Sequence, residues 1–329
     1  MKDKILVIGS NSFSGASYVK FLLERNHSVL GVSRSEEKGE LFLPYKWIKH
    51  QDFTFNKFDL NYDVDSLVSL VQKEKIPYII TFSAERRVGV NWENPENWFL
   101  KTSVALHRLI KKLNKISFIK KYVHITTPEV YGSCSGFISE NAPINPSTPY
   151  ATSRVASDLI LKNYFDGYGF PFVATRAANV FGPGQQLYRI IPKAIYSILS
   201  GIKIPLHGGG ESTRSFISMD DVSEATYSIM YDGLAGETYH ISTNELISIK
   251  ELVDNICKKL NKNFSACVTL EDDRIGKDKT YQLSSEKLRN QFSWAEKKSL
   301  DESLNETIDW VIKYFKQFKT EDLIYKHKL

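Results

Sequence analysis

The sequence predicts an α/β fold: a doubly wound parallel sheet of the Rossmann type with a smaller mixed α/β lobe. Over the first 176 residues, short apolar segments alternate with amphipathic ones, as in parallel strands joined by crossover helices. The first apolar segment, residues 4–8, runs into a turn of small residues and then into helical spacing at residues 16–24. After Gly184 the alternation loosens, and this change predicts the second lobe.

A chain of 329 residues is long enough to bury a large core and to divide into two lobes. We expect one domain from residues 1–178 plus about 217–243, and a second from residues 179–216 plus about 244–329. The apolar runs are shorter than a membrane span, and the first residues lead directly into a strand rather than a secretory leader. These features predict a cytoplasmic protein that does not enter a membrane.

Cysteine usage and charge narrow the class of protein further. The three cysteines show neither a CxxC spacing nor nearby histidines, so we expect no disulfide framework and no metal site. The net charge of +5 is mild, and the lysine-rich residues 111–121 are typical of a solvated helix end and connector. Nucleic acid is therefore not an expected partner.

The turn after the first strand reads Gly9-Ser10-Asn11-Ser12-Phe13-Ser14-Gly15. A strand, a turn of small residues and a helix together direct backbone N–H groups and a helix N-terminus at a pyrophosphate. Gly9, Ser12, Phe13 and Gly15 are therefore candidate cofactor-binding residues. The pattern Gly-x-x-Gly-x-x-Gly is imperfect here, because Ser12 takes the place of its middle glycine.

The second strand, residues 28–32, is followed by Ser33 and Arg34. Enzymes that prefer NAD usually place an acidic residue at this strand end, whereas hydroxyl groups and arginine suit the 2′-phosphate of NADP. The sequence thus favours NADP, with NAD as the alternative. An exposed loop position without a ligand is the other interpretation of Arg34.

The most informative stretch begins with a predicted strand at residues 122–126. Thr127 and Glu129 stand at its end, and after a loop rich in Gly, Ser, Asn and Pro a helix opens near Tyr150. Arg154 follows four residues later on the same helix face. A fixed positive neighbour stabilises a phenolate, so Tyr150 is a candidate base. An ordinary pair on the helix surface is the alternative.

Two motifs in this stretch, Thr-Thr-x-Glu-Val-Tyr-Gly and Pro-Ser-Thr-Pro-Tyr-x-x-Ser-Arg, resemble the catalytic segment of extended short-chain dehydrogenase/reductases that act on nucleotide sugars. Their pattern is most similar to that of the NDP-hexose 4,6-dehydratases, and the resemblance extends over almost the whole chain. It implies a tightly bound nicotinamide dinucleotide and a nucleotide-diphosphate sugar as substrate. It also implies a homodimer formed by helices at about residues 97–112 and 150–164, and a usual setting in surface polysaccharide synthesis.

The resemblance also implies roles for individual residues. Tyr150 would remove the proton of the 4-hydroxyl that Thr127 holds, Arg154 would bind the nicotinamide ribose, and Glu129 would take the C5 proton. Asp59 and Leu60 would hold the adenine, and Ser83 and Ala84 would line the cofactor's ribose and phosphates. The implied substrate-binding residues are Glu85, Thr127, Asn179, Arg189, His207, Arg214 and Arg274. For His207, a turn beside three glycines is an equal alternative.

Two departures leave the reaction open. Arg154 replaces the family's lysine, and Pro128 stands where dehydratases carry Asp or sometimes Ser to help the 6-hydroxyl leave. A 4,6-dehydratase is the first interpretation, because a pure epimerase has no need of Glu129. A 4-epimerase or a uronic-acid decarboxylase is the second, and a nucleotide-sugar-binding protein without turnover is the third.

The candidate segments share one expected location. Gly9, Ser33, Asp59, Ser83, Thr127 and Asn179 each fall just past the end of a predicted strand. Open α/β sheets bind their ligands at the carboxyl ends of the strands. The sequence therefore predicts a single site along this edge.

Overall fold

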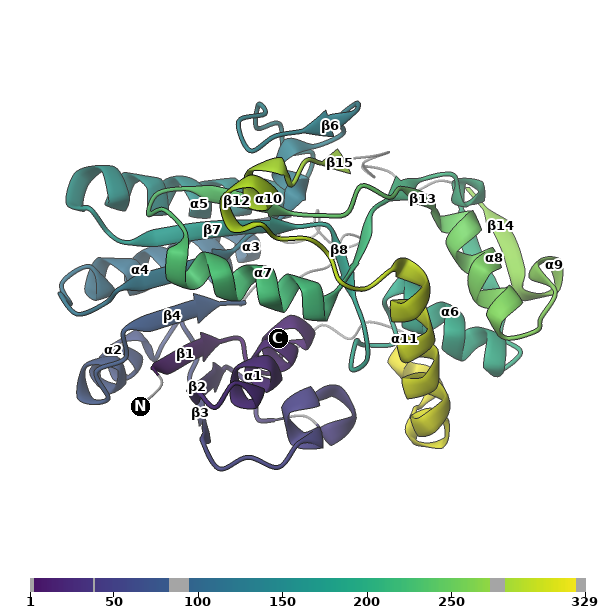
Figure 1. Ribbon diagram of the computed structural model, residues 1–329, viewed down its shortest axis with the longest axis horizontal. Helices are drawn as coiled ribbons and strands as arrows, with labels where there is room; N and C mark the ends of the chain where they lie inside the picture. The colour runs from purple at the N-terminus through teal and green to yellow at the C-terminus, as the bar shows by residue number, and fades with distance from the viewer. Residues whose placement is uncertain (1–2, 38, 83–94, 273–281, 324–329) are drawn as a thin grey trace.

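The computed structural model describes residues 3–37, 39–82, 95–272 and 282–323, and its centre is a parallel sheet of seven strands (Figure 1). The strand order is β12-β7-β5-β4-β1-β2-β3. From β1 the chain adds β2 and β3 on one side and then β4, β5, β7 and β12 on the other, which confirms the predicted doubly wound fold. The strands are β1 (Lys4–Ile8), β2 (Ser28–Ser33), β3 (Phe53–Lys57), β4 (Tyr78–Thr81), β5 (Lys121–Ile125), β7 (Phe172–Ala177) and β12 (Thr238–Ile241).

Helices cover both faces of this sheet. Helices α1 (Phe13–Glu24) and α7 (Met219–Asp232) pack on one face, and α2 (Val64–Lys73), α4 (Ala105–Leu113) and α5 (Pro149–Tyr168) pack on the other. Successive side chains of a strand point to opposite faces, so Val7 joins the α1–α7 core and Leu6 joins the α2–α4–α5 core. Burial on both sides explains why these strands are almost continuously apolar.

The helix predicted at about residues 97–112 is less regular than its sequence suggests. It consists of α3 (Pro95–Trp98), a π-helical segment (Phe99–Val104) and α4. Strand β5 begins one residue earlier than expected, at Lys121, and ends at Ile125. Thr126 and Thr127 therefore both lie beyond the strand, in the turn that leads to Glu129.

A second group of elements encloses its own hydrophobic core, and Figure 1 shows most of it to the right of the sheet. The chain enters it from β7 through β8 (Asn179–Phe181). Its other elements are α6 (Ile190–Leu199), β9 (Ile204–His207), β10 (Thr213–Arg214), β11 (Phe216–Ser218), β13 (Ile247–Ser248), α8 (Ile249–Lys259), α9 (Phe264–Cys267), β14 (Val268–Glu271) and α11 (Leu300–Tyr314). Above β12 lie α10 (Glu286–Phe292) and β15 (Gln282–Leu283), which pairs with β6 (Phe137–Ile138).

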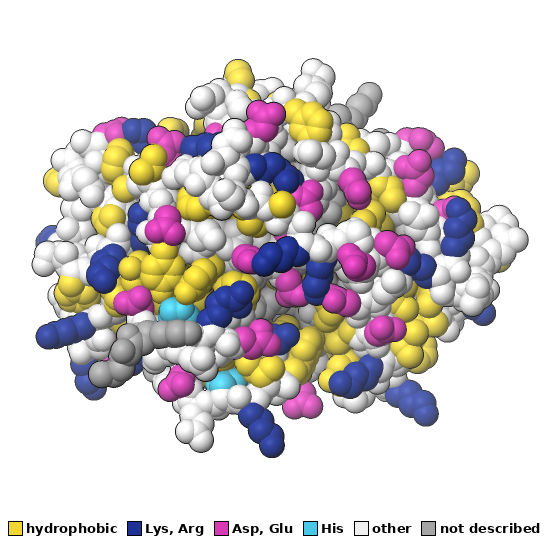
Figure 2. All heavy atoms as spheres, in the orientation of Figure 1, with side chains coloured by type: hydrophobic (Ala, Val, Ile, Leu, Met, Phe, Trp, Pro, Cys, Tyr) yellow, Lys and Arg dark blue, Asp and Glu magenta, His cyan; other side chains and the backbone are white. Residues whose placement is uncertain are grey.

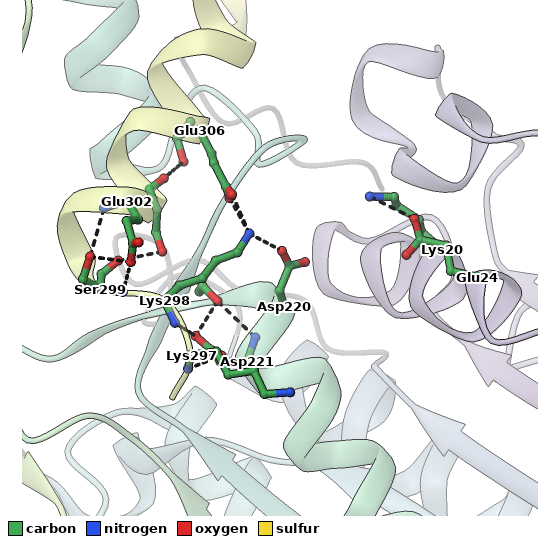
Figure 3. Close-up of polar contacts among 12 residues, drawn as sticks. Lys20, Glu24, Asp220, Asp221, Lys297, Lys298, Ser299, Glu302 and Glu306 are labelled. Carbon is green, nitrogen blue, oxygen red and sulfur yellow. Dashed lines mark hydrogen bonds and ion pairs between the residues drawn. The ribbon is translucent and has the colours of Figure 1, made fainter. Parts of the chain in front are cut away.

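The start of α7 is tied to the segment that precedes α11 (Figure 3). Lys298 Nζ lies 2.7 Å from Asp220 Oδ2 on α7 and 2.6 Å from Glu306 Oε1 on α11. The buried Asp221 accepts a hydrogen bond from the backbone N–H of Lys297 at 2.8 Å. These contacts join the sheet's helical layer to the second group of elements.

The molecular surface carries charges of both signs. Figure 2 shows Lys, Arg, Asp and Glu side chains interspersed over one face, which is typical of a solvated surface. Among the helices of the described residues, none has both the length and the apolar character needed to cross a membrane.

Candidate functional site

The predicted common edge is confirmed by the register of the sheet. Ile8 at the end of β1 pairs with Val32 of β2 and Thr81 of β4, and Ile125 at the end of β5 pairs with Thr175 of β7. All these strands are parallel, so the turns that follow them meet along one edge. This places Gly9, Asp59, Thr127 and Asn179 after the ends of their strands along one edge, while Ser33, expected just beyond its strand, is the last residue of β2. Ser83, Ala84, Glu85 and Arg274 fall outside the described residues.

The turn after β1 is built for close backbone contact. Gly9 has φ +88°, and a Cβ at Gly15 would lie only 2.2 Å from the Gly9 carbonyl oxygen. Ser12 caps α1, because its Oγ accepts from the Gly15 N–H at 3.0 Å and donates to the Gly9 carbonyl at 2.7 Å. The N–H groups in the first turn of a helix have no intrahelical partner, and in α1 this first turn begins at Phe13. This cradle fits the pyrophosphate of a dinucleotide.

The turns after β2 and β3 are held by local hydrogen bonds. Ser33 Oγ accepts from the Asn11 N–H at 2.9 Å, which ties the end of β2 to the loop after β1. The side chain of Arg34 is half-buried, so Arg34 is not the fully exposed loop residue of the alternative interpretation. Asp59 Oδ1 accepts from both nitrogens of Asn61 at 2.8 Å, and the adjacent Leu60 packs against the α2–α4–α5 core. One carboxylate oxygen of Asp59 therefore stabilises its own turn.

Thr127 and Glu129 lie on one short turn beyond β5. Thr127 is buried and caps a 3-10 turn (Pro128–Tyr131), with its Oγ1 accepting from the Glu129 N–H at 3.3 Å. Glu129 is half-buried. Pro128 occupies the first position of the turn, where the fixed φ of proline suits the backbone and its missing N–H has little structural cost.

Tyr150 is the second residue of α5, which begins at Pro149 and is capped by Thr148. Its side chain is 3 % exposed, and its ring meets Trp98 edge-on with the ring centroids 5.3 Å apart. Arg154 is 2 % exposed, and its guanidinium donates to the Ile125 carbonyl and lies 3.3 Å from His124 Nε2. The alternative of a helix-surface pair is therefore wrong, because both side chains lie in the core beside β5.

The buried guanidinium of Arg154 also has a free donor. Its Nε has no hydrogen-bond partner within the described residues. An unpaired buried N–H costs free energy, and this atom is inaccessible to solvent. Arg154 therefore places a buried positive charge beside β5.

Sequence reasoning missed a buried polar cluster beneath these residues, made up of His124, Tyr131, Asp158, Arg176 and His240. Arg176 Nη2 donates to Asp158 Oδ2 at 2.8 Å, and Thr126 Oγ1 donates to the same oxygen at 3.2 Å. Burial disfavours the carboxylate, but the contact with His124 and the charges of Arg176 and Arg154 lower the pKa of Asp158 to about 2. With both histidines neutral, the charged side chains here are Arg154, Arg176 and Asp158, and Glu140 lies beside them with its Oε1 accepting from the His240 backbone N–H at 2.8 Å.

The two histidines are neutral for a common reason. Burial, followed by the charge of Arg176, lowers the pKa of His240 to about 3, and burial likewise lowers the pKa of His124. His240 Nδ1 lies 3.2 Å from the Ser284 carbonyl, which can only accept, so Nδ1 carries the proton. His240 Nε2 must then accept from the Tyr131 hydroxyl at 2.8 Å. Charged or imidazole side chains inside otherwise apolar strands were the sequence signal for this cluster.

The predicted substrate residues of the second group lie on elements that follow β7. Asn179 begins β8 and its N–H bonds the Ser215 carbonyl at 3.0 Å, while Arg189 caps α6. His207 ends β9 and directly precedes the turn Gly208–Gly210, so it lies beside the three glycines, with its Nδ1 3.2 Å from Glu271 Oε2. Arg214 lies on β10, and its Nη1 donates to the Thr213 carbonyl at 2.7 Å.

Comparison with known proteins agrees with this architecture. The chain is 28% identical over 327 residues to the dTDP-D-glucose 4,6-dehydratase of Bos taurus, covering 97% of this chain and 91% of that one. A dTDP-glucose 4,6-dehydratase from Streptomyces venezuelae, solved with NAD bound, superposes with a TM-score of 0.89 at 25% identity, covering 96% of this chain and 99% of that one.

A longer relative matches over only part of its length. The chain is 29% identical over 267 residues to a trifunctional UDP-glucose 4,6-dehydratase, epimerase and reductase of Arabidopsis thaliana, with 80% of this chain and 40% of that protein covered. The family described as "GDP-mannose 4,6 dehydratase" matches residues 6–307. The chain therefore belongs to this family, within the short-chain dehydrogenases/reductases that act on nucleotide sugars, as the Tyr150 and Thr127 motifs predicted.

Proposed function

We propose that this chain is a nucleotide-sugar 4,6-dehydratase that uses a nicotinamide dinucleotide. The observation that carries the proposal is that the turn with Thr127 and Glu129, beyond β5, packs against α5, which holds Tyr150 in its first turn. A hydroxyl, a carboxylate and a phenol here supply a hydrogen-bond donor and two bases. Oxidation at C4 followed by elimination needs those groups.

The chain's residues fit the cofactor along its length. Gly9, Ser12, Phe13 and Gly15 would hold the pyrophosphate; Ser33 and Arg34 the adenosine ribose; Asp59 and Leu60 the adenine; and Tyr150 and Arg154 the nicotinamide ribose. When bound, the nicotinamide accepts a hydride from C4 of the sugar and returns it at C6. A cofactor that ends each cycle unchanged has no need to leave, which supports tight binding.

The protein side chains carry the protons. Thr127 orients the 4-hydroxyl of the sugar by a hydrogen bond, and Tyr150 takes the proton of that hydroxyl as C4 is oxidised. The new ketone acidifies the C5 proton, which Glu129 removes. The C6 oxygen takes one proton and leaves as water, and a proton delivered to C5 by the protein would complete the 4-keto-6-deoxy sugar.

The preference between NADP and NAD stays a prediction. Ser33 and the half-buried Arg34 lack the carboxylate that binds both ribose hydroxyls of NAD, which favours NADP. The similar enzyme from Streptomyces venezuelae was solved with NAD. Identifying the nicotinamide released from the purified protein, and titrating the stripped protein with each dinucleotide, decides between them.

The sugar nucleotide would lie between the sheet edge and the second group of elements. We assign residues 1–178 plus about 217–243 to the dinucleotide domain, and residues 179–216 plus about 244–329 to the sugar-nucleotide domain. Asn179, Arg189 and Arg214 supply donors suited to a sugar diphosphate, and His207 would flank the base.

A homodimer in the cytoplasm is the proposed assembly. Leu100, before α4, is 49% exposed, and Leu159, on α5, is 52% exposed, so both predicted interface helices carry exposed leucines. Light scattering after gel filtration tests the dimer. Replacing both leucines with Glu is expected to yield a monomer.

Pro128 favours a second candidate, a C4-oxidising 4-epimerase or uronic-acid decarboxylase. Proline has no proton to give to the departing 6-hydroxyl, so a dehydratase needs water or another side chain for that step. A binding protein without turnover is the remaining alternative.

The test incubates the purified protein with UDP-, dTDP-, GDP- and CDP-sugars in deuterated buffer, and analyses the products by mass spectrometry and proton NMR. A product that lacks one water and carries deuterium at C5 supports the dehydratase and names its nucleotide. An isomer of equal mass, or loss of carbon dioxide, supports the second candidate instead.

A variant ties any observed activity to this site. Tyr150→Phe removes the proposed C4 base and is expected to abolish C4 oxidation with every sugar, while the protein still binds the dinucleotide. Unchanged turnover in this variant would mean that the chemistry occurs elsewhere.

A further inference from the structure

One buried side chain joins the helix that carries Tyr150 to the turn that carries Glu129. Arg176, on β7, donates from Nη2 to Asp158 Oδ2 at 2.8 Å and from Nη1 to the Tyr131 hydroxyl. Asp158 lies on α5 with Tyr150, and Tyr131 ends the 3-10 turn that contains Glu129. A single guanidinium therefore contacts both elements of the candidate site.

The contacts leave this guanidinium little freedom. Arg176 is 4% exposed, and its central carbon lies 4.7 Å from the centroid of the Tyr131 ring. Its planar fork fixes two donors in one geometry, which a lysine could not do. The carboxylate of Asp158 is further held by Thr126, the residue just before Thr127.

Further hydrogen bonds hold Tyr131, the residue that Arg176 contacts on the Glu129 turn. Tyr131 is 1% exposed and donates to His240 Nε2 at 2.8 Å, while His240 donates from Nδ1 to the Ser284 carbonyl at 3.2 Å. Each hydrogen bond has a fixed direction, because the guanidinium only donates and the carbonyl only accepts. A buried network of this kind specifies one arrangement of the turn.

We propose that Arg176 and Tyr131 are positioning residues that set where the Glu129 carboxylate lies relative to Tyr150. The inference rests on the proposed dehydratase function, in which Tyr150 acts during C4 oxidation and Glu129 acts only afterwards, at C5. Neither positioning residue needs to touch the substrate. Loosening the turn should therefore impair the second step while the first continues.

The test compares Tyr131→Phe with the matched control Tyr122→Phe. Both tyrosines are buried and use their hydroxyl in a hydrogen bond, but the Tyr122 hydroxyl accepts from Thr81 on β4 at 2.7 Å, whereas the Tyr131 hydroxyl bonds Arg176 and His240. Two rates are measured in each variant: reduction of the bound nicotinamide on addition of sugar nucleotide, and deuterium exchange at C5. In Tyr131→Phe we expect C5 exchange to fall about tenfold or more relative to nicotinamide reduction, with KM unchanged.

The control and a second variant complete the design. Tyr122→Phe should leave the ratio of the two rates as in the wild type, whatever its effect on thermal stability. Arg176→Lys keeps the charge but loses the fork, so its ratio should fall in the same direction as that of Tyr131→Phe. Equal losses of both rates in Tyr131→Phe, or the same altered ratio in Tyr122→Phe, would overturn the proposal.

Failure of the dehydratase function has a different signature. A wild-type protein that never exchanges C5 would refute that function, and the crystal structure of Tyr131→Phe would then decide the positioning role. If residues 127–131 of the variant are displaced from α5, the positioning role is supported. If they superpose on the same residues of the wild type, it is overturned.

Discussion

Acidification should destabilise this protein through His240, well above the range in which its carboxylates titrate. His240 is completely buried, and its surroundings include Arg176, Lys287, the Tyr131 hydroxyl and the Ser284 carbonyl. Burial first, and then the Arg176 charge, lowers the pKa of His240 from 6.5 to about 3. Between these values the unfolded chain binds a proton that the folded protein does not, so the free energy of unfolding falls as the pH falls.

The size of the effect follows from the two pKa values. With an unfolded value of 6.5 and a folded value of about 3, His240 lowers the free energy of unfolding by about 2 kcal/mol between pH 8 and pH 5. Asp158 adds little in this interval. Its pKa is lowered to about 2, so the stability that it contributes is lost only below about pH 4.

Urea unfolding, followed by tryptophan fluorescence at several pH values between 8 and 5, measures the free energy of unfolding. His240→Gln keeps an acceptor for Tyr131 and a donor for Ser284 but does not titrate. Its free energy of unfolding should therefore fall by about 2 kcal/mol less than that of the wild type between pH 8 and pH 5. If His240→Gln declines as steeply as the wild type, His240 is not held neutral and the hydrogen-bond directions assigned to the cluster are wrong.

Three further substitutions test the site. Gly15→Ala places a Cβ 2.2 Å from the Gly9 carbonyl, and it should cost about 1–3 kcal/mol of stability and weaken dinucleotide binding. Gly167→Ala, with open space around it, should do neither. Calorimetry of both variants with and without cofactor checks these expectations. Glu129→Gln should stop deuterium exchange at C5 while reduction of the bound nicotinamide continues, and persisting exchange in the NMR spectrum would remove Glu129 as the base. Pro128→Asp supplies a proton donor and should raise the rate of water loss about a hundredfold if that step is limiting; an unchanged rate in the mass-spectrometric assay would show that another donor already serves.

Much of the fold could be predicted from the sequence, because periodicity reports burial directly. The strand at Lys4–Ile8 is apolar on both faces after its first residue, as expected of a parallel sheet covered by helices, and Phe172–Ala177 is likewise buried although it carries Thr175 and Arg176. The common edge followed from strand direction alone. The π-helical segment at Phe99–Val104 could not be foreseen, because its residues suit an ordinary helix and tertiary packing decides the difference.

The site was predictable only where the chemistry stands close together in the chain. Thr127, Glu129 and Tyr150 lie within one stretch, but Arg176 and His240 come from distant strands that pair with each other in the sheet. No local pattern reports that pairing. The interpretation of Tyr150 and Arg154 as a surface pair failed for the same reason, because the spacing gives the helix face but not what covers it.

The three departures from the family's motifs differ in what the fold can absorb. Ser12 replaces a glycine but serves as the cap of α1, so the turn after β1 keeps its geometry. Arg154 replaces a lysine, and the Ile125 carbonyl and His124 hold its larger head in the core while Nε stays free of partners within the described residues. Pro128 also fits its turn, but its side chain has no proton to give. Structure therefore accommodates all three residues, and chemistry singles out position 128 as the one that decides between complete dehydration and a reaction that stops at the 4-ketone.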